Sequence, residues 1–457
     1  MQSKGMVIKM NQVLSCDMTT GSETKHIIRF AFPLLAGNLL QQLYNIVDTI
    51  IVGRFLGDEA LAAVGATGSI TYFFYTLCLG LSIGAGVIIS QYFGSKKYKQ
   101  LKTAIFNSAA VTAVFGFAVS IISVLLTEPV LRLLRTPEHL LPVSAGYMRI
   151  ACGGTIAVAA YNWINSVMRS LGDSKTPLFF LGFASILNVG LDLLFVVSLN
   201  MGVNGAATAT VTAQLSAAIL SIIYAFSKNP HIKLSKSEVF IDKNAVLKCI
   251  KTGIPIAAQN GMISISMIAI QSVTNTFGET IMAAYTVSMR IEQFVQQPFS
   301  SLNAAMSAFV GQNIGAGKQK RAINGLHIGL RISTVFSLAV LILFMIFSQN
   351  LVGCFVKTDD VISIGSKAII LTSFFYVFLG SIHVSRGFLN GAGDTNYAFV
   401  NGLVEVICRI GLSVILTRIA FIDYWGIWAT TCITWFMTAL VSILRYKQGK
   451  WKSKAVL

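Results

Sequence analysis

The chain has 457 residues, of which 54% are hydrophobic and only 12% are charged. A soluble protein carries about twice that share of charged residues, so the composition excludes a pair of soluble domains. The net charge of +17 does not indicate nucleic-acid binding, because most of the 35 Lys and Arg residues lie in the termini and in alternate connections between apolar segments. Cytoplasmic loops of membrane proteins show this bias, and the chain is therefore expected to cross a lipid bilayer many times.

Twelve apolar segments follow one another, each long enough for the roughly 20 residues that a membrane-spanning helix needs. We therefore expect an all-α membrane protein with twelve transmembrane helices. The even number places both termini on one side, and the Lys and Arg bias makes that side cytoplasmic. The expected spans are residues 27–52, 60–92, 102–126, 142–169, 177–199, 203–226, 247–276, 281–313, 322–347, 361–390, 396–420 and 425–445.

The two halves of the chain repeat at a constant offset of 221 residues, as Gln91 and Gln312 or Gly172 and Gly393 show. A constant register indicates a duplicated unit. Each unit has six spans, so two six-helix lobes are expected to be related by a pseudo-two-fold axis along the membrane normal. The expected domains are a cytoplasmic N-terminal segment (1–26), an N-lobe (27–226), a cytoplasmic linker (227–246), a C-lobe (247–445) and a cytoplasmic tail (446–457).

Two features of the repeats concern the cytoplasmic ends of the helices. The second and eighth spans are too long for a single crossing and are expected to extend beyond the membrane as far as Gly94 and Gly315. The repeated turns Gly172-Asp173 and Gly393-Asp394 are expected to be structural. In each, the glycine ends one helix and the aspartate caps the next.

The first span carries a polar face. At 100° per residue, Gln41, Tyr44 and Asp48 form one stripe and Asn45 lies on the next. This face is too polar for lipid, so it must look into protein or a water-filled cavity. Asp48 is its only ionisable group, and carboxylates at membrane depth usually mark an ion or proton path because they are costly to bury. The alternative is a buried aspartate that Tyr44 and a neighbour satisfy for packing alone.

Further polar residues lie in the next spans of the N-lobe. Asn188 and Asp192 are one helical turn apart in the fifth span, Thr210 lies in the sixth, and Asn162 and Asn165 share a face of the fourth. Hydrogen bonding between helices explains any single Asn or Thr here. Two carboxylates with amide and hydroxyl oxygens, however, are hard ligands that suit a proton or Na⁺. The cluster therefore indicates a cation site.

The C-lobe does not repeat these acids, because Ala269 and Ser413 stand at the positions equivalent to Asp48 and Asp192. Ion coupling is therefore expected mainly in the N-lobe. The polar residues of the C-lobe form either a self-neutralising structural network or the lining of a cavity. Within this set, Glu405 and Arg409 are four residues apart and can pair on one helix. The residues in question are Asn260, Gln271, Arg290, Glu292, Glu405 and Arg409.

Catalytic and nucleotide-binding motifs are missing from the sequence. The segment around Lys318 fails the P-loop pattern, because Gln319 stands where Ser or Thr would bind Mg²⁺. The cysteines lack CxxC spacing, and no nucleophile–base pair falls at membrane depth. We therefore expect a protein that is not an enzyme and has no cofactor and no metal other than a possible Na⁺.

Together these features resemble the multidrug and toxic compound extrusion (MATE) family over essentially the whole chain. The matching motifs are Pro33 with Asp48 and Gly53 in the first span, the turns Gln91–Gly94 and Gly311–Gly315, Leu171–Asp173, Asn188 with Asp192, and Gly202–Ala207. The resemblance implies a bilobed antiporter that exports amphipathic, often cationic compounds in exchange for H⁺ or Na⁺. We further expect a monomer in the lipid bilayer of the bacterial cell membrane.

The resemblance also assigns residues. It implies a cation site at Asp48, Asn188, Asp192 and Thr210, with Tyr44, Asn162 and Asn165 in its hydrogen-bond network. It makes Pro33 the position of a bend in the first span. This chain lacks the seventh-span Glu and tenth-span Asp with which some members build a cation site in the C-lobe.

One alternative of related architecture is a lipid-linked precursor flippase or polysaccharide exporter. Such a protein must hold phosphate groups, which requires several Arg or Lys residues in its cavity. Here the cations at membrane depth are few and the N-lobe is acidic. The sequence leaves open which compounds are carried and whether H⁺ or Na⁺ drives their transport.

Overall fold

The computed structural model describes residues 15–134, 136–235 and 238–456, and these form helices joined by short connections. The N-lobe contains α2 (Glu23–Leu56), α3 (Asp58–Gly94), α4 (Tyr98–Leu133), α5 (Leu141–Gly153), α6 (Thr155–Ser170), α7 (Lys175–Asp192) with the π-helical segment η1 (Leu193–Ser198), and α8 (Gly202–Lys228). The C-lobe contains α9 (Lys243–Thr274), η3 (Asn275–Phe277), α10 (Glu279–Gly315), α11 (Gln319–Gly353), α12 (Asp359–Ser373), α13 (Tyr376–Gly391), α14 (Asn396–Leu416), η4 (Asp423–Trp425), α15 (Gly426–Lys447) and η5 (Lys450–Ser453).

Every expected span corresponds to one of these helices or to a broken pair of them. The fourth span is divided into α5 and α6 at Gly154, and the tenth into α12 and α13, which are bent by 50° relative to each other. The breaks fall at equivalent places in the two repeats. The expectation for the long second and eighth spans is confirmed, since α3 ends at Gly94 and α10 at Gly315.

Within the described ranges, nine helices are long and apolar enough to cross a membrane, and the bent pair α12–α13 makes up to ten. The two remaining expected spans are α2 and α10, with 34 and 37 residues. They are long enough but more polar, and a polar helix at membrane depth needs protein or water on its polar face. Both helices line the junction of the lobes, where α10 packs against α2 and α3.

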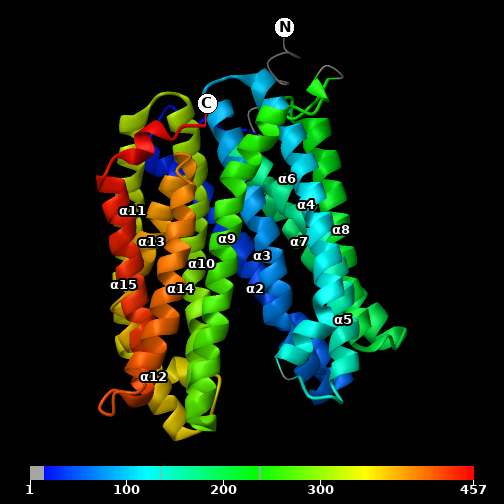
Figure 1. Ribbon diagram of the computed structural model, residues 1–457, viewed down its shortest axis with the longest axis vertical. Coiled ribbons are helices and arrows are strands. Elements are labelled where there is room, and N and C mark those ends of the chain that lie inside the picture. The colour runs from blue at the N-terminus through cyan, green and yellow to red at the C-terminus, as the bar shows by residue number, and fades with distance from the viewer. Residues whose placement is uncertain (1–14, 135, 236–237, 457) are drawn as a thin grey trace.

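The two lobes lie close together at the end of the bundle that carries both chain termini, and they diverge toward the opposite end (Figure 1). We call the first the terminal end. Here the backbones of α3 and α10 approach so closely that a side chain at Gly94 would collide with the carbonyl oxygen of Gln312, and one at Gly315 with that of Gln91. Glycine at both repeated positions therefore permits the lobes to close.

The two repeated Gly-Asp turns share the conformation of their glycine but differ in the partner of their aspartate. Gly172 and Gly393 have φ angles of +84° and +90°, which glycine adopts without strain. Asp173 caps α7 as expected, because its Oδ1 accepts hydrogen bonds of 3.0 Å from the backbone N–H groups of Lys175 and Thr176.

The expected cap at the second turn is wrong. The carboxylate of Asp394 instead accepts two hydrogen bonds from Arg445 of α15, at 2.7 and 2.9 Å. A bidentate arginine–carboxylate pair joins two charge-assisted hydrogen bonds with opposite charge and a fixed geometry. The position equivalent to Arg445 in the first repeat is Tyr224, which offers Asp173 no cation.

Candidate cation site in the N-terminal lobe

The two expected acids of the N-lobe face each other. Asp48 lies about two turns before the end of α2 and Asp192 is the last residue of α7, and their carboxyl groups are within hydrogen-bonding reach. Asp192 is fully buried, whereas Asp48 is half-buried. Two ionised carboxylates this close repel each other, so the pair favours a shared proton or a cation between its oxygens.

The local helix geometry contributes to the close approach of Asp48 and Asp192. Immediately after Asp192 the chain changes from α-helix to the π-helical segment η1, which contacts both α2 and α8. Short π-helical segments occur frequently at functional sites. Here the wider turn follows directly on the residue that faces Asp48.

Asn188 and Thr210 complete the immediate surroundings of the pair. In one orientation of its amide, the Nδ2 of Asn188 lies 3.3 Å from the hydroxyl of Thr210. With the amide turned over, Nδ2 donates to Oδ2 of Asp192 at 2.9 Å and the amide oxygen accepts from the backbone N–H of Thr210 at 3.2 Å. The second orientation is favoured, because it places the amide nitrogen against an acceptor and the amide oxygen against a donor.

Two oxygens remain without a partner. Oδ1 of Asp48 and Oδ1 of Asp192 are both buried and accept no hydrogen bond from the described part of the chain. Buried polar atoms in folded proteins are nearly always paired. A proton or a small cation is what such oxygens can accept.

Tyrosines surround the pair on its other sides. Tyr44 lies one turn before Asp48, and its hydroxyl is within hydrogen-bonding reach of Thr210. Tyr147 of α5 is close enough to both carboxyl groups to interact with their charge. The sequence analysis missed Tyr147, although a tyrosine hydroxyl within a span needs a polar partner and could have indicated it.

The other expected N-lobe residues are less closely tied to the pair. Gln41 and Asn45 are exposed on α2. Asn165 is buried and Asn162 half-buried in α6, but no hydrogen bond among the described residues joins either of them to Asp48 or Asp192. Pro33 is buried within α2, which continues through it as one helix.

In the C-lobe the expected pairing of Glu405 with Arg409 is confirmed at 3.2 Å, and both side chains are buried. Arg386 of α13 joins them, with a guanidinium nitrogen 3.5 Å from Glu405 and 2.8 Å from Oδ1 of Asn401. The sequence analysis did not single out Arg386, although an arginine inside a span indicates a buried partner. For these residues the geometry favours the self-neutralising network.

Glu292 is buried, accepts a 2.8 Å hydrogen bond from Gln296 on its own helix and lies close enough to Arg409 to interact with its charge. The other expected C-lobe residues do not join this network. Asn260 donates to the backbone oxygen of Thr76 in α3 at 3.3 Å. Gln271 donates to a neighbouring residue on the protein surface at 2.9 Å, and Arg290 is exposed.

Two lobes of duplicated helices, the first of which holds a buried acidic pair, are the architecture of membrane transporters built from internal repeats. Residues 33–194 and 255–415 match the family model MatE. The chain belongs to this family, the MATE transporters.

Relatives of this chain described as multidrug resistance proteins agree with its membership of the MATE family. The chain is 29% identical to the probable multidrug resistance protein YpnP of Bacillus subtilis (strain 168), over 96% of this chain and 98% of YpnP. It is 22% identical to the probable multidrug resistance protein NorM of Thermotoga maritima, over 95% and 94% of the two chains.

Solved structures share the fold. A MATE protein crystallised in the straight conformation aligns with a TM-score of 0.88 at 22% identity, over 97% of this chain and 99% of that one. An outward-facing multidrug resistance MATE transporter of the MOP superfamily aligns with the same score at 21% identity, over 96% and 98%.

Proposed function

We propose that this protein exports amphipathic, often cationic drugs or toxic compounds in exchange for H⁺ or Na⁺, and that the coupling ion binds at the Asp48–Asp192 pair. The observation that carries the proposal is the meeting of these two carboxyl groups, each with a buried oxygen that lacks a partner. The substrate class is supported by the relatives described as multidrug resistance proteins.

The shape of the molecule supports alternating access. The lobes are closed at the terminal end and diverge at the other (Figure 1), and the Lys and Arg bias makes the terminal end cytoplasmic. In our proposal this arrangement corresponds to the outward-open state, in which the coupling ion loads and lowers the affinity for the drug. The inward-open state releases the ion and takes up the drug, because exchange requires that the two bind in competition.

The energy that one ion supplies is modest. A monovalent cation that crosses the full membrane potential gains about 2.3 kcal/mol per 100 mV. At about 1.4 kcal/mol for each tenfold ratio, one ion therefore supports about a fortyfold gradient of a neutral compound at 100 mV. One-for-one exchange with a monovalent cationic compound moves no net charge and draws only on the concentration gradient of the ion.

Pro33 supports the coupling of ion binding to movement. A proline inside a helix removes one backbone hydrogen bond and weakens the helix locally. Pro33 lies in α2, the helix that also carries Asp48. In our proposal, ion binding at Asp48 changes the bend of α2 at Pro33.

The flippase alternative receives no support from the C-lobe. A phosphate site requires arginines that are free to bind the ligand. Arg386 and Arg409 both contact Glu405, and the N-lobe site is acidic. We therefore infer drug transport rather than phosphate transport or catalysis, by a monomer without a cofactor in the bacterial cell membrane.

The decisive experiment measures drug efflux in vesicles with the Na⁺ gradient and the H⁺ gradient imposed separately. We expect one gradient to drive efflux and Asp48→Asn to abolish it. The exposed Asp360 provides the matched control, because Asp360→Asn makes the same change away from the site. Efflux by Asp48→Asn at the wild-type rate would contradict the proposed ion site.

A further inference from the structure

The repeated glutamines of the two lobes make matching bonds across the terminal end. Nε2 of Gln312 in α10 donates to the backbone oxygen of Ser170 in the N-lobe at 3.0 Å. Nε2 of Gln91 in α3 donates to the backbone oxygen of Gly391 in the C-lobe at 2.9 Å. Ser170 and Gly391 are themselves equivalent in the duplication. Each glutamine therefore ties its own lobe to the turn of the other.

The oxygen of each glutamine holds one end of the chain. Oε1 of Gln312 accepts a 2.9 Å hydrogen bond from the backbone N–H of Met18. Oε1 of Gln91 accepts a 2.7 Å hydrogen bond from the backbone N–H of Val456. Both glutamines are fully buried, so these bonds form away from competing water. Segments near opposite ends of the chain thus occupy equivalent places.

The same equivalence holds two residues earlier in each segment. The carbonyl oxygen of Cys16 lies against Gly172, and that of Lys454 lies against Gly393. A side chain at either glycine would collide with that oxygen. The repeated glycines therefore make room for the segments Cys16–Met18 and Lys454–Val456, which lie outside the duplicated spans.

Each segment contacts both lobes. The backbone N–H of Cys16 donates to Leu171 O of the N-lobe at 2.9 Å, while Met18 binds Gln312 of the C-lobe. Lys454 lies against Gly393 of the C-lobe, while Val456 binds the N-lobe helix α3. We call the segments Cys16–Met18 and Lys454–Val456 the N-latch and the C-latch.

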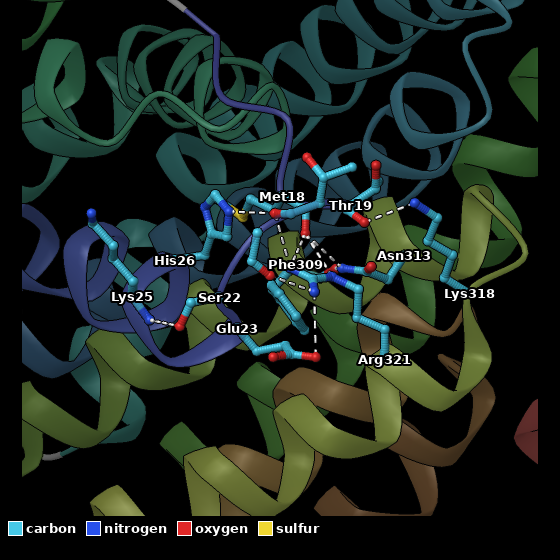
Figure 2. A network of polar contacts seen from close by, with 12 residues as sticks. Met18, Thr19, Ser22, Glu23, Lys25, His26, Phe309, Asn313, Lys318 and Arg321 are labelled. Atoms are coloured by element: carbon cyan, nitrogen blue, oxygen red, sulfur yellow. Dashed lines mark hydrogen bonds and ion pairs between the residues drawn. The ribbon is translucent and has the colours of Figure 1, made fainter.

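Cationic side chains of the C-lobe reinforce the N-latch (Figure 2). Arg321 donates to the backbone oxygen of Met18 through Nε at 3.2 Å and to that of Gly21 through Nη1 at 2.7 Å. Lys318 donates to the backbone oxygen of Thr19 at 2.8 Å. The side chain of Met18 is 1% exposed and packs in the same hydrophobic cluster as Phe309 of α10. The segment is therefore docked by main-chain bonds, charge and burial together.

We propose that the N-latch and the C-latch hold the terminal end closed, and that each must release one of the two lobes it contacts before the lobes separate there. Separation of the lobes breaks the bond of each glutamine to the opposite turn, and each latch loses one of its two lobes. The latches thereby stabilise the state that is open at the opposite end. This inference rests on the alternating access of the proposed function, but not on the coupling ion.

The test measures the distance between the lobes at the terminal end of the full-length protein. Spin labels are placed at Lys99 and Gln319, which are both exposed and lie on opposite lobes, in a background whose native cysteines are replaced. Pulsed electron–electron double resonance then reports the fractions of molecules in which the two labels are close together and far apart. We expect short separations to dominate in the otherwise unaltered chain.

Two kinds of variant release the latches. Gln91→Leu and Gln312→Leu each remove two buried hydrogen bonds, which together shift the open-to-closed ratio by about tenfold. A chain that ends at Ser453 removes the C-latch and leaves every helix intact. Lys320→Ala is the control, since Lys320 is exposed next to Arg321. We expect it to leave the distances unchanged.

An unchanged distance distribution in both glutamine variants and in the shortened chain would contradict the proposal that the latches hold the terminal end closed. The outcome is independent of the ion site. Longer distances in these variants together with efflux by Asp48→Asn would support the latches and contradict only the proposed coupling site. Unchanged distances together with lost efflux in Asp48→Asn would contradict the latches and support the proposed coupling site.

Discussion

The buried C-lobe network allows a prediction that separates a structural role from a cavity role. Glu405 uses one oxygen to contact Arg409 at 3.2 Å and the other to contact Arg386 at 3.5 Å. Glu405→Gln keeps the shape of the side chain but leaves Arg386 without the acid it contacts and Arg409 with Glu292 as its remaining counter-charge. Removing one partner of a buried ion pair costs about 3–5 kcal/mol. We therefore expect a strong loss of stability.

The assay is thermal unfolding of the purified protein in detergent, followed by intrinsic fluorescence. A loss of this size lowers the Tm by several degrees even in a large protein. The chain offers a matched control in Glu128, which also contacts two arginines, Arg132 at 2.9 Å and Arg149 at 3.2 Å, but on the surface. Because solvent screens exposed ion pairs, Glu128→Gln should leave the Tm unchanged.

A second variant checks the explanation. Glu405→Leu combined with Arg386→Met removes the acid and one of its two cations, and should recover part of the Tm lost in Glu405→Gln, because the remaining Arg409 keeps Glu292 as its counter-charge. The reasoning is refuted if Glu405→Gln unfolds at the wild-type temperature and yet loses drug export. That result would place Glu405 in a substrate cavity.

Three further predictions concern single residues. Asn188→Leu removes the amide that donates to Asp192, and because that hydrogen bond stabilises the ionised carboxylate, its loss should lower the proton concentration for half-maximal efflux about tenfold; an unchanged proton dependence would remove Asn188 from the site. Gly393→Ala forces a side chain toward Lys454 O at a positive φ, and should reduce the free energy of unfolding by about 1–2 kcal/mol and so lower the Tm. Gly411→Ala is the control and should leave the Tm unchanged, because a side chain at Gly411 meets no atom within 4 Å. Asp173→Ala removes the cap of α7 and should cost about 1 kcal/mol, measurable as a lower Tm, and an unaltered Tm would show that the cap contributes nothing.

The sequence by itself determined the number and order of the spans, because hydrophobic length is a local property that needs no knowledge of neighbours. It also determined the duplication and the polar face of the first span that carries Asp48. The pairing of Glu405 with Arg409 was predictable for the same reason, since residues four apart on one helix are neighbours whatever surrounds them.

Only the tertiary structure decided which helices meet. It placed Asp48 of α2 beside Asp192 of α7, added Tyr147 from α5, and brought Arg386 to Glu405. None of these contacts is fixed by spacing along the chain, because each joins residues of different helices.

The repeated Gly-Asp turns show the physical reason most clearly. Asp173 and Asp394 are equivalent in the duplication, and locally both are suited to cap the following helix. Asp173 does so, but Asp394 binds Arg445, because α15 brings a guanidinium group that forms a bidentate ion pair with its carboxylate. The partner that packing supplies, Arg445 in one lobe and Tyr224 in the other, decides what the same local sequence does.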